Sequence, residues 1–371
     1  MNKFFVSTHI YSGVNSLDVL QRFKNKRVWV VCDSFIAKSP AFSRLKGLLE
    51  PANQVALYSD ITPDPSIGIV VEGIRHFTEI KPDVVIGFGG GSAIDAAKAI
   101  VYFARKQGMD IETCVAIPTT SGTGSEVTSA TVISDPEKGI KYPIFEESIY
   151  PDVAILDPSL VVTVPPNITA NTGMDVLTHA IEAYVAKGAA DFTDALAEKA
   201  AELVFQYLPT ACTKGDCLQT RAKLHNASAM AGMAFSQAGL GLNHAIAHQL
   251  GGQFHVAHGL ANSLLLTQVI QYNASHDARA AKRYVRLAKA CRLCPVEAND
   301  QAAINQLLNR IRQLQKQVGI ATTLGQLKIG ARQVHESLNA MIKAAQADST
   351  MGSTPCAISD DDLARIIEAI L

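Results

Sequence analysis

Short, unbroken apolar runs alternate with helical stretches through the first 165 residues or so of this 371-residue chain. Residues 28–32 and 84–86 are such runs, while residues 69–80 and 93–104 are typical of helices. Strands that alternate with helices predict βαβ units and a mostly parallel sheet. Because the runs are apolar throughout, without polar residues at alternate positions, we expect the strands to be covered on both faces.

The residue composition and the spacing of apolar residues change after Pro165-Pro166. From Thr169 onward, Ala, Leu, His and Glu at helical spacing dominate, and runs typical of strands become scarce. We therefore expect an α/β N-terminal domain with a Rossmann-like, mostly parallel sheet over residues 1–165, and an all-α C-terminal domain over residues 166–371. The length of the chain also favours two domains, since single hydrophobic cores stop growing well short of it.

Charge and composition exclude several classes of protein. The formal net charge is −1, which gives no electrostatic reason to expect nucleic acid or an anionic membrane as a partner. No apolar run approaches the roughly 20 residues that span a bilayer, and the N-terminus lacks the features of a secretory signal. The seven cysteines are odd in number and irregularly spaced, as is typical of reduced thiols in the cytoplasm.

A glycine-rich turn, with Gly90, Gly91 and Ser92, follows the strand predicted at residues 84–86. Glycine lets the backbone approach a ligand closely, and the N-terminus of the following helix favours a phosphate or pyrophosphate. The match to the dinucleotide fingerprint is not strict, because Ser92 stands where that fingerprint has glycine. A plain strand-to-helix turn is therefore the alternative interpretation.

Two further features lie where predicted strands end. Residues 118–128 are rich in hydroxyl groups, and Asp33 closes the first predicted strand. Ligands of open α/β sheets bind at the carboxyl ends of the strands, so both features indicate the same edge as the glycine-rich turn. The alternatives are a solvated polar loop for residues 118–128 and an ordinary helix N-cap for Asp33.

Histidines are concentrated in the second half of the chain, where six of the ten lie between positions 179 and 258. Asp175 and His179 are four residues apart, as are His244 and His248, so each pair shares one face of a helix. Imidazoles beside a carboxylate suit iron or zinc, and His258 follows nearby. The alternative is a set of buried core histidines. The pattern lacks the glutamate of a zinc protease helix, which disfavours peptide hydrolysis.

A pyrophosphate-binding α/β half followed by a helical, metal-binding half resembles the iron-containing (group III) alcohol dehydrogenase family, whose fold is shared by dehydroquinate synthase. Segments that resemble family motifs, in family order, are residues 89–98, 119–128, 171–182 and 241–259. Within the family, residues 117–129 and 235–259 are most similar to the dehydrogenases of propanediol-utilisation microcompartments, which act on propionaldehyde and 1-propanol. Ethanol dehydrogenases of ethanolamine utilisation are a close second.

The resemblance implies a role for each of a large set of residues. It implies metal ligands at Asp175, His179, His244 and His258, with Fe²⁺ favoured and Zn²⁺ as the alternative. It implies that His248 lies near the reacting carbon without binding the metal. The residues that it implies for binding NAD(H) are Asp33, Asp64, Gly90, Gly91, Ser92, Thr119, Thr120, Thr123, Thr128 and Lys141. Asp64 departs from the asparagine that many relatives carry in that loop.

The function that the resemblance implies is reversible hydride transfer between NAD(H) and short-chain primary alcohols and aldehydes, in a cleft between the two domains. It also implies a homodimer or larger homo-oligomer in the cytoplasm. A microcompartment is a further expected location, with its shell or co-encapsulated enzymes as partners. The alternatives are a lactaldehyde reductase, a metal lyase resembling dehydroquinate synthase, and a non-catalytic subunit associated with a shell.

Overall fold

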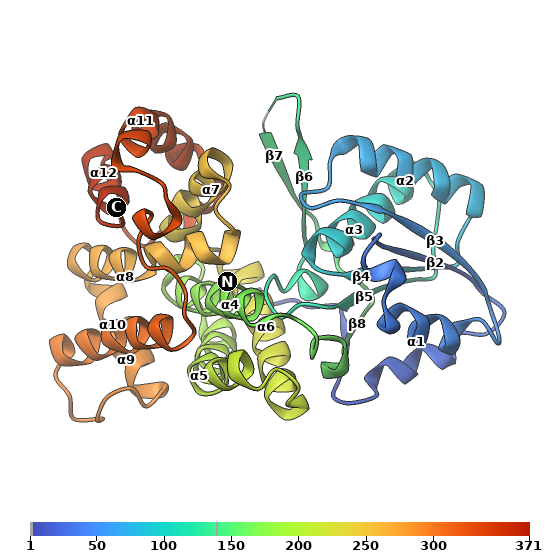
Figure 1. Ribbon diagram of the computed structural model, residues 1–371, viewed down its shortest axis with the longest axis horizontal. Coiled ribbons are helices and arrows are strands. Elements are labelled where there is room, and N and C mark those ends of the chain that lie inside the picture. Colours follow the sequence, from blue (N-terminus) through green and yellow to red (C-terminus); the bar gives the residue numbers. More distant parts are fainter. Residues whose placement is uncertain (1–2, 139) are drawn as a thin grey trace. The chain divides into compact units, whose positions relative to one another are not determined.

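The computed structural model describes residues 3–138 and 140–371 and divides them into two compact units (Figure 1). The sheet unit comprises residues 5–163 and 216–232. The helical unit comprises residues 164–215 and 233–371, together with residues 3 and 4. The chain thus changes unit close to Pro165-Pro166. Residues 216–232 differ from the predicted division, because they are grouped with the sheet unit and not with the other helices.

A six-stranded sheet forms the centre of the sheet unit, with the order β1-β8-β5-β4-β2-β3. Every pair of neighbouring strands is parallel, which confirms the predicted parallel sheet. The strands are β1 (His9–Ser12), β2 (Arg27–Asp33), β3 (Gln54–Ile61), β4 (Val84–Gly89), β5 (Thr113–Pro118) and β8 (Val153–Leu156). A separate antiparallel pair consists of β6 (Ala130–Asp135) and β7 (Ile140–Phe145).

Helices cover both faces of the parallel sheet. They are α1 (Pro40–Leu49), α2 (Ile67–Ile80) and α3 (Gly91–Lys106), joined by the first part of α6 (Leu218–Ala238) within the unit. Side chains alternate along β2, so that Val28 and Val30 join one buried cluster while Trp29 and Val31 join another. The first cluster includes residues of α1 and the second includes residues of α2 and α3. This two-sided burial explains the unbroken apolar runs.

Helices α4, α5 and α7 to α12 make up most of the helical unit, whose described residues contain no strand. Their bounds are α4 (Pro166–Val185), α5 (Asp191–Thr213), α7 (Leu242–Phe254), α8 (His258–His276), α9 (Ala278–Ala290), α10 (Asp300–Gln317), α11 (Ala331–Ala347) and α12 (Asp360–Glu368). Helix α4 is buried over most of its length and packs against α5 and α8. It therefore lies at the centre of the unit.

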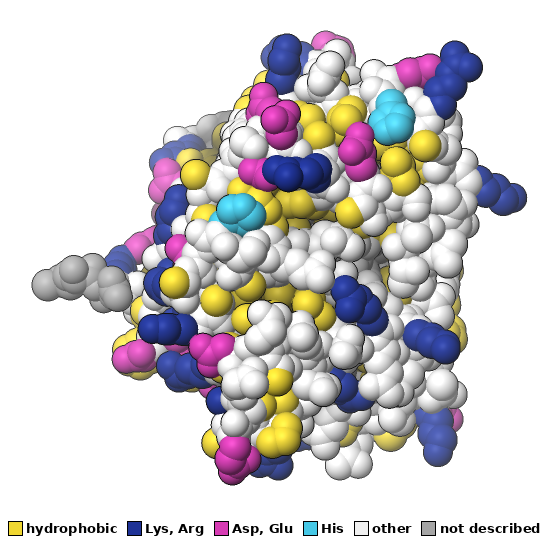
Figure 2. Space-filling model, turned by 90° about the vertical axis from the view of Figure 1, so that its left-hand side faces the viewer, with side chains coloured by type: hydrophobic (Ala, Val, Ile, Leu, Met, Phe, Trp, Pro, Cys, Tyr) yellow, Lys and Arg dark blue, Asp and Glu magenta, His cyan; other side chains and the backbone are white. Residues whose placement is uncertain are grey.

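Short 3₁₀ helices connect the longer elements. They are η1 (Ser16–Arg22), η2 (Ile36–Lys38), η3 (Ser125–Val127), η4 (Glu147–Ile149), η5 (Pro158–Leu160), η6 (Gly325–Leu327) and η7 (Ser349–Ser353). None of the described helices is both long and apolar enough to cross a membrane. On the face drawn in Figure 2, acidic and basic side chains are interspersed among apolar ones, which agrees with the formal net charge of −1.

Candidate functional site

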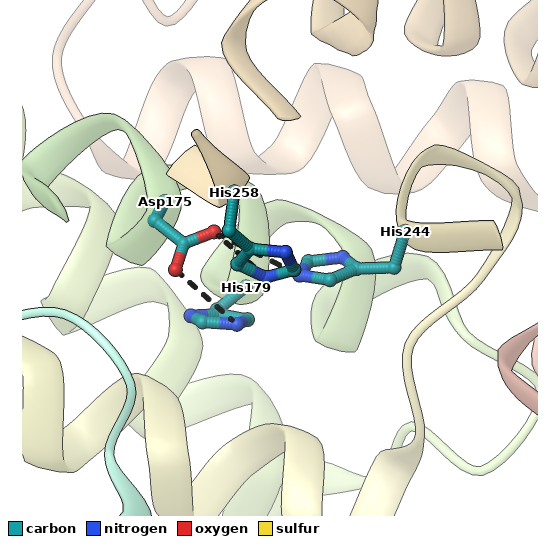
Figure 3. A group of neighbouring side chains, drawn as sticks. All are labelled: Asp175, His179, His244 and His258. Atoms are coloured by element: carbon teal, nitrogen blue, oxygen red, sulfur yellow. Dashed lines mark ion pairs between the residues drawn. The ribbon is translucent and has the colours of Figure 1, made fainter. Parts of the chain in front are cut away.

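Asp175, His179, His244 and His258 come together in the helical unit, where one potential ligand atom from each lies within 4.8 Å of all the others (Figure 3). The Oδ2 atom of Asp175 is 4.0 Å from Nε2 of His179. Its Oδ1 atom is 3.9 Å from Nε2 of His244 and 3.5 Å from Nε2 of His258. The first three residues are buried, and His258 is exposed. The structure thus gathers the whole implied ligand set.

Three helices bring these four side chains to one place. Asp175 and His179 lie one turn apart on α4, His244 lies on α7, and His258 is the first residue of α8. The close approach of α8 to α4 depends on Gly259, because a Cβ at this position would lie 2.1 Å from the carbonyl oxygen of Asn171. Any larger residue would push the start of α8, and His258 with it, away from α4.

The donor set fits a divalent metal ion. It consists of three imidazoles and one carboxylate, the nitrogen and oxygen ligands that iron and zinc accept. Burial lowers the pKa of His244 far below its ordinary value, and the neighbouring His179 and His258 lower it further. A neutral imidazole keeps the lone pair that ligation requires. A second buried carboxylate, Glu182, lies beside the cluster, and a cation would compensate both negative groups.

Glu182 holds His244 from the side opposite the cluster. Its Oε1 accepts a hydrogen bond of 2.7 Å from the backbone N–H of Asn243, and its Oε2 contacts Nδ1 of His244. Burial raises the pKa of Glu182 to about 8, because its effect outweighs that of the hydrogen bonds from backbone N–H groups, which lower the pKa. A cation at Nε2 of His244 would favour the ionised carboxylate, with Nδ1–H donating to it. Sequence reasoning missed this residue, although Asp175, His179 and Glu182 have the i, i+4, i+7 spacing of one helical face.

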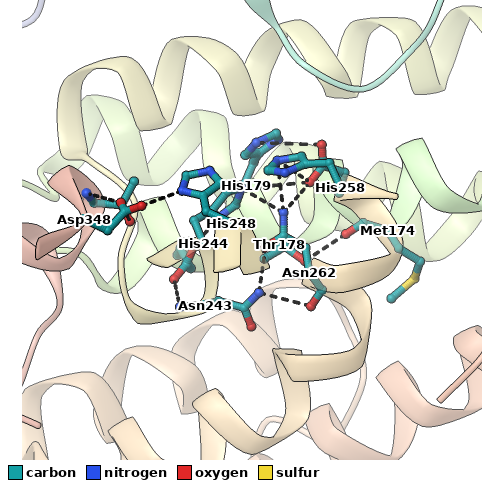
Figure 4. Close-up of polar contacts among 12 residues, drawn as sticks. Met174, Thr178, His179, Asn243, His244, His248, His258, Asn262 and Asp348 are labelled. Carbon is teal, nitrogen blue, oxygen red and sulfur yellow. Dashed lines mark hydrogen bonds and ion pairs between the residues drawn. The ribbon is translucent and has the colours of Figure 1, made fainter. Parts of the chain in front are cut away.

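Asn262 holds the carboxylate of Asp175 in a similar way. Its Nδ2 donates to Oδ1 of Asp175 at 2.7 Å, while its Oδ1 accepts from Nδ2 of Asn243 at 2.9 Å (Figure 4). The same Nδ2 lies 3.0 Å from Nε2 of His244. Both asparagines are fully buried, so their amides are fixed in orientation. Neither was predicted from the sequence, although Asn262 follows His258 by one turn of α8.

His248 lies beside the four residues but is not among them. It follows His244 by one turn on α7, and its ring stacks on that of His258 with the centroids 5.5 Å apart. Its Nδ1 is 2.8 Å from Oδ2 of Asp348, and its side chain is 36% exposed. The ring is therefore both adjacent to the cluster and in contact with solvent, as a group that transfers protons requires. Asp348 was not predicted from the sequence.

In the sheet unit, the predicted cofactor residues meet where β4 and β5 end. Gly90 precedes α3 as its N-cap, and Gly91 and Ser92 are its first two residues. The backbone N–H of Thr119 donates to the carbonyl of Gly89 at 2.8 Å, so the two strand ends lie together.

Gly91 allows this loop to approach α3 closely, because a Cβ at this position would lie 2.7 Å from Cγ2 of Thr123. At Gly90 a Cβ would make only an ordinary contact, 3.7 Å from Oγ1 of Thr120. The structure therefore brings the glycine-rich turn and the hydroxyl-rich loop to one edge of the sheet. The free N–H groups at the start of α3 make this edge suitable for a pyrophosphate.

Asp33 ends β2 at the same edge. Its Oδ1 accepts hydrogen bonds of 2.8 Å from the backbone N–H groups of Phe35 and Ile36. These bonds stabilise the turn before η2, whose N-cap is Phe35 and not Asp33. Its Oδ2 is 3.8 Å from the position that a Cβ of Gly89 would occupy. One carboxylate oxygen is thus used within the loop, while the other faces the glycine-rich turn.

Three more of the predicted cofactor residues occupy different surroundings. Lys141 donates from Nζ to Oδ1 of Asp64 at 2.7 Å, and both side chains are mainly exposed. Thr128 is buried, and its Oγ1 accepts from Nζ of Lys98 at 3.1 Å. Lys98 also donates to the carbonyl of Ser125 at 2.8 Å, and burial lowers its pKa to about 8. The hydroxyl of Thr128 is therefore buried and bonded to Lys98, which also holds the backbone of the hydroxyl-rich loop at Ser125. The contact with Lys98 was not predicted.

Comparison with known proteins gives consistent matches over the whole chain. Residues 7–158 match the iron-containing alcohol dehydrogenase family, and residues 169–371 match the C-terminal part of the same family. The chain is 61% identical to the 1-propanol dehydrogenase PduQ of Citrobacter freundii, and equally to that of Salmonella typhimurium, over the full length of each chain. It is 37% identical to an NADPH-dependent butanol dehydrogenase of Clostridium saccharobutylicum, and this match covers 100% of this chain and 98% of the relative.

Solved structures match over the full length as well. A crystal structure of a 1,3-propanediol oxidoreductase has a TM-score of 0.92 at 31% identity, and an alcohol dehydrogenase from Oenococcus oeni has a TM-score of 0.93 at 28% identity. Each match covers 100% of both chains. These likenesses agree with the fold described above, a parallel sheet unit followed by helices.

Proposed function

Because the chain belongs to the iron-containing alcohol dehydrogenase family, we propose that its substrates are propionaldehyde and 1-propanol and that NAD(H) is its cofactor. Membership confirms the resemblance seen in the motifs and identifies the protein as an alcohol dehydrogenase. The substrate proposal is supported by the 61% identity to the two 1-propanol dehydrogenases, against 37% for the butanol dehydrogenase. The observation that carries the chemistry is the cluster of Asp175 with three histidines.

In this proposal the four clustered side chains of the helical unit hold one divalent metal, with iron favoured and zinc as the alternative. When bound, the metal would supply Lewis acidity at the substrate oxygen. The ligand set carries one negative charge, that of Asp175, so it does not cancel the charge of a divalent ion. Glu182 and Asn262 keep His244 and Asp175 in orientations from which Nε2 and the carboxylate oxygens can ligate.

The sheet unit binds the cofactor in this proposal, and the cofactor supplies the hydride chemistry. The backbone N–H groups of Gly91 and Ser92 at the start of α3 would hold the pyrophosphate. The carboxylate of Asp33 would accept hydrogen bonds from the ribose hydroxyls of the adenosine and would repel a 2′-phosphate, which favours NAD over NADP. Support for this assignment comes from the Oδ1 atom, because its two backbone hydrogen bonds fix the direction of the carboxylate.

His248 moves the proton of the alcohol hydroxyl in this proposal. It lies against His258 and is partly exposed, so it can pass a proton between the substrate oxygen and solvent. Imidazole is the side chain that most often performs such proton transfers. No side chain is needed to act on carbon, since the carbon exchanges only a hydride.

Metal content and NADH oxidation, measured together across C2 to C4 aldehydes, test the proposal. We expect a metal-containing protein with its highest kcat/KM for propionaldehyde and a smaller value with NADPH. A preference for acetaldehyde would favour an ethanol dehydrogenase, and a preference for lactaldehyde in a parallel assay would favour a lactaldehyde reductase. Metal-free, inert protein would contradict the enzyme mechanism and favour a structural subunit.

We also propose that the protein assembles as a homodimer or larger homo-oligomer in the cytoplasm and that it is packaged in a microcompartment. The likeness to the PduQ dehydrogenases supports the packaging, whereas the oligomer is an implication of the family resemblance. Sedimentation of the purified protein tests the oligomer. Co-purification of the protein with intact shells, compared with a cytoplasmic marker enzyme, tests the packaging, and an equal loss of both proteins on washing would contradict it.

A further inference from the structure

We propose that Asp348 is a positioning residue that fixes the ring orientation and the tautomer of His248. This inference rests on the proposed function in one respect, namely that His248 is the group that exchanges a proton with the substrate oxygen. The contact itself joins parts of the chain that are 100 residues apart, with Oδ2 of Asp348 2.8 Å from Nδ1 of His248 (Figure 4).

The direction of the Asp348 carboxylate is set by the backbone that follows it. Asp348 is the N-cap of η7, and its Oδ1 accepts hydrogen bonds from the backbone N–H of Thr350 at 2.9 Å and from Oγ1 of Thr350 at 2.7 Å. With Oδ1 held in this way, Oδ2 is directed at Nδ1 of His248 on α7. The side chain of Asp348 is 13% exposed, so water competes little for either oxygen.

The ring of His248 is held by contacts with other rings. It stacks on His258 with an angle of 18° between the ring planes, and it meets His244 edge-on with the centroids 6.0 Å apart. Stacking sets the plane of the ring, but it does not decide which nitrogen carries the proton. The hydrogen bond at Nδ1 makes that choice.

An ionised carboxylate can only accept hydrogen bonds, so a neutral His248 must carry its proton on Nδ1 and keep the lone pair on Nε2. Burial raises the pKa of Asp348, but the hydrogen bonds from His248 and Thr350 outweigh burial and hold the pKa below its ordinary value. Asp348 therefore stays ionised at neutral pH. The lone pair of His248 is confined to the edge of the ring away from Asp348.

The proton balance of the reaction then follows. In alcohol oxidation, Nε2 of His248 would accept the hydroxyl proton and release it to solvent, and in aldehyde reduction Nε2 would pass a proton from solvent to the substrate oxygen. The bound cofactor would supply the matching hydride chemistry at carbon. The Nδ1–H···Oδ2 bond persists throughout, so Asp348 neither gains nor loses a proton.

The substitution Asp348→Asn tests the inference without removing the cap, because asparagine is as good an N-cap as aspartate. The amide oxygen must take the place of Oδ1 to accept from Thr350, which turns the NH₂ group towards His248. An NH₂ donor at Nδ1 forces the proton of the ring to Nε2, where it blocks the proposed acceptor. The equivalent exchange in a catalytic triad lowers kcat severely for this reason.

We expect Asp348→Asn to lower kcat for propionaldehyde reduction by a factor on the order of 10². The KM values for aldehyde and NADH should stay within about twofold, and the metal content per chain should be unchanged, because no ligand is altered. Thr350→Val is the matched control. It removes only the hydroxyl bond to Oδ1 and leaves the contact with His248, so kcat should remain within about twofold of the wild type.

A spectroscopic readout makes the test independent of activity. Two-bond ¹H–¹⁵N correlation spectra of ¹⁵N-histidine-labelled, zinc-loaded protein distinguish the tautomers, and a His248→Gln variant assigns the signal. We expect Nδ1 to be protonated in the wild type and in Thr350→Val, and Nε2 to be protonated in Asp348→Asn.

Two sets of results would overturn the inference. One is a wild-type protein whose neutral His248 carries its proton on Nε2, or an unchanged tautomer in Asp348→Asn. The other is an equal loss of kcat in Asp348→Asn and Thr350→Val, which would indicate a merely structural role. A wild type that oxidises no NADH with any aldehyde would contradict the proposed function alone, because the spectra still decide the role of Asp348.

Discussion

The candidate metal centre and the candidate cofactor-binding edge are built by different means. The metal centre consists entirely of side chains, from three helices, and three of its four ligands are buried. The cofactor edge consists largely of backbone at the start of α3, where Gly91 lies too close to Thr123 to carry a Cβ. The metal centre depends on the nitrogen and oxygen atoms of its side chains, whereas the cofactor edge depends on the absence of a Cβ atom.

This difference decides what each site needs for support. A ligating side chain has rotatable bonds, so other groups must hold it, and Glu182 and Asn262 do this for His244 and Asp175. A backbone N–H at a helix N-terminus is already held by the helix. The cofactor edge therefore depends on room for the ligand beside the backbone, and it does not depend on neighbouring side chains that orient its N–H groups. The variants below test this difference.

The largest effect is expected from His258→Ala. Removing a ligand should abolish stable metal binding, and turnover should fall by a factor on the order of 10³ or more, because the metal contributes several kcal/mol to the transition state. Metal analysis and NADH oxidation on the same sample measure both effects. The matched variant His248→Ala should keep its metal and lose only rate, so equal metal loss in the two variants would contradict the assigned roles.

A smaller loss of metal affinity is expected from Glu182→Gln. The amide keeps the size of the side chain but removes the negative charge opposite Nδ1 of His244, and changes of this kind cost roughly 10- to 100-fold in affinity. Competition with a chelator of known affinity measures the change. Glu202→Gln, on the partly exposed surface of α5, is the control. Equal affinities in the two variants would show that His244 is oriented without Glu182.

Gly91→Ala should damage the cofactor edge and leave the metal centre intact. The added Cβ would meet the side chain of Thr123 at 2.7 Å, so the turn or Thr123 must shift. A shift that weakens cofactor binding by about 1.4 kcal/mol corresponds to roughly a tenfold rise in the KM for NADH. Gly47→Ala, on α1 with open space around the new Cβ, is the control. A change in metal content, or an unchanged KM, would contradict a role confined to cofactor binding.

The smallest effect is expected from Asp33→Ala. Loss of the partly exposed Asp33 charge should weaken its repulsion of the 2′-phosphate of NADPH by about 0.5–1 kcal/mol. The preference for NADH over NADPH should therefore fall about two- to fivefold. The ratio of kcat/KM values for the two cofactors measures it. Asp33→Asn separates the two functions of this residue, since the amide oxygen can still accept the hydrogen bonds from the backbone N–H groups of Phe35 and Ile36. If the asparagine variant retains the full preference, charge repulsion is not the cause.

Much of this protein could be predicted from local pattern. Unbroken apolar runs predicted a two-sided parallel sheet, because strands covered on both faces exclude polar residues. Spacing of four residues placed Asp175 with His179 and His244 with His248, because such residues share a helical face. The choice of the four ligands, and of the cofactor residues, came from the family resemblance.

The groups that orient the site could not be found in this way. Glu182 reaches His244 across 62 positions, and Asp348 reaches His248 across 100. Local periodicity states which face a residue occupies, but it does not state which other helix that face will meet. The grouping of residues 216–232 with the sheet unit was missed for the same reason, since their pattern is helical in either unit.

The sequence by itself determined the kinds of element and the chemistry available at each, because strand and helix periodicities and ligand types are properties of short segments. It also determined where backbone can approach closely, since glycine has no Cβ. Tertiary structure alone decided which carboxylate faces which imidazole, and therefore which nitrogen of His244 and His248 is left to act. The physical reason is that a hydrogen bond depends on distance and direction, and these are set only when helices far apart in the chain pack together.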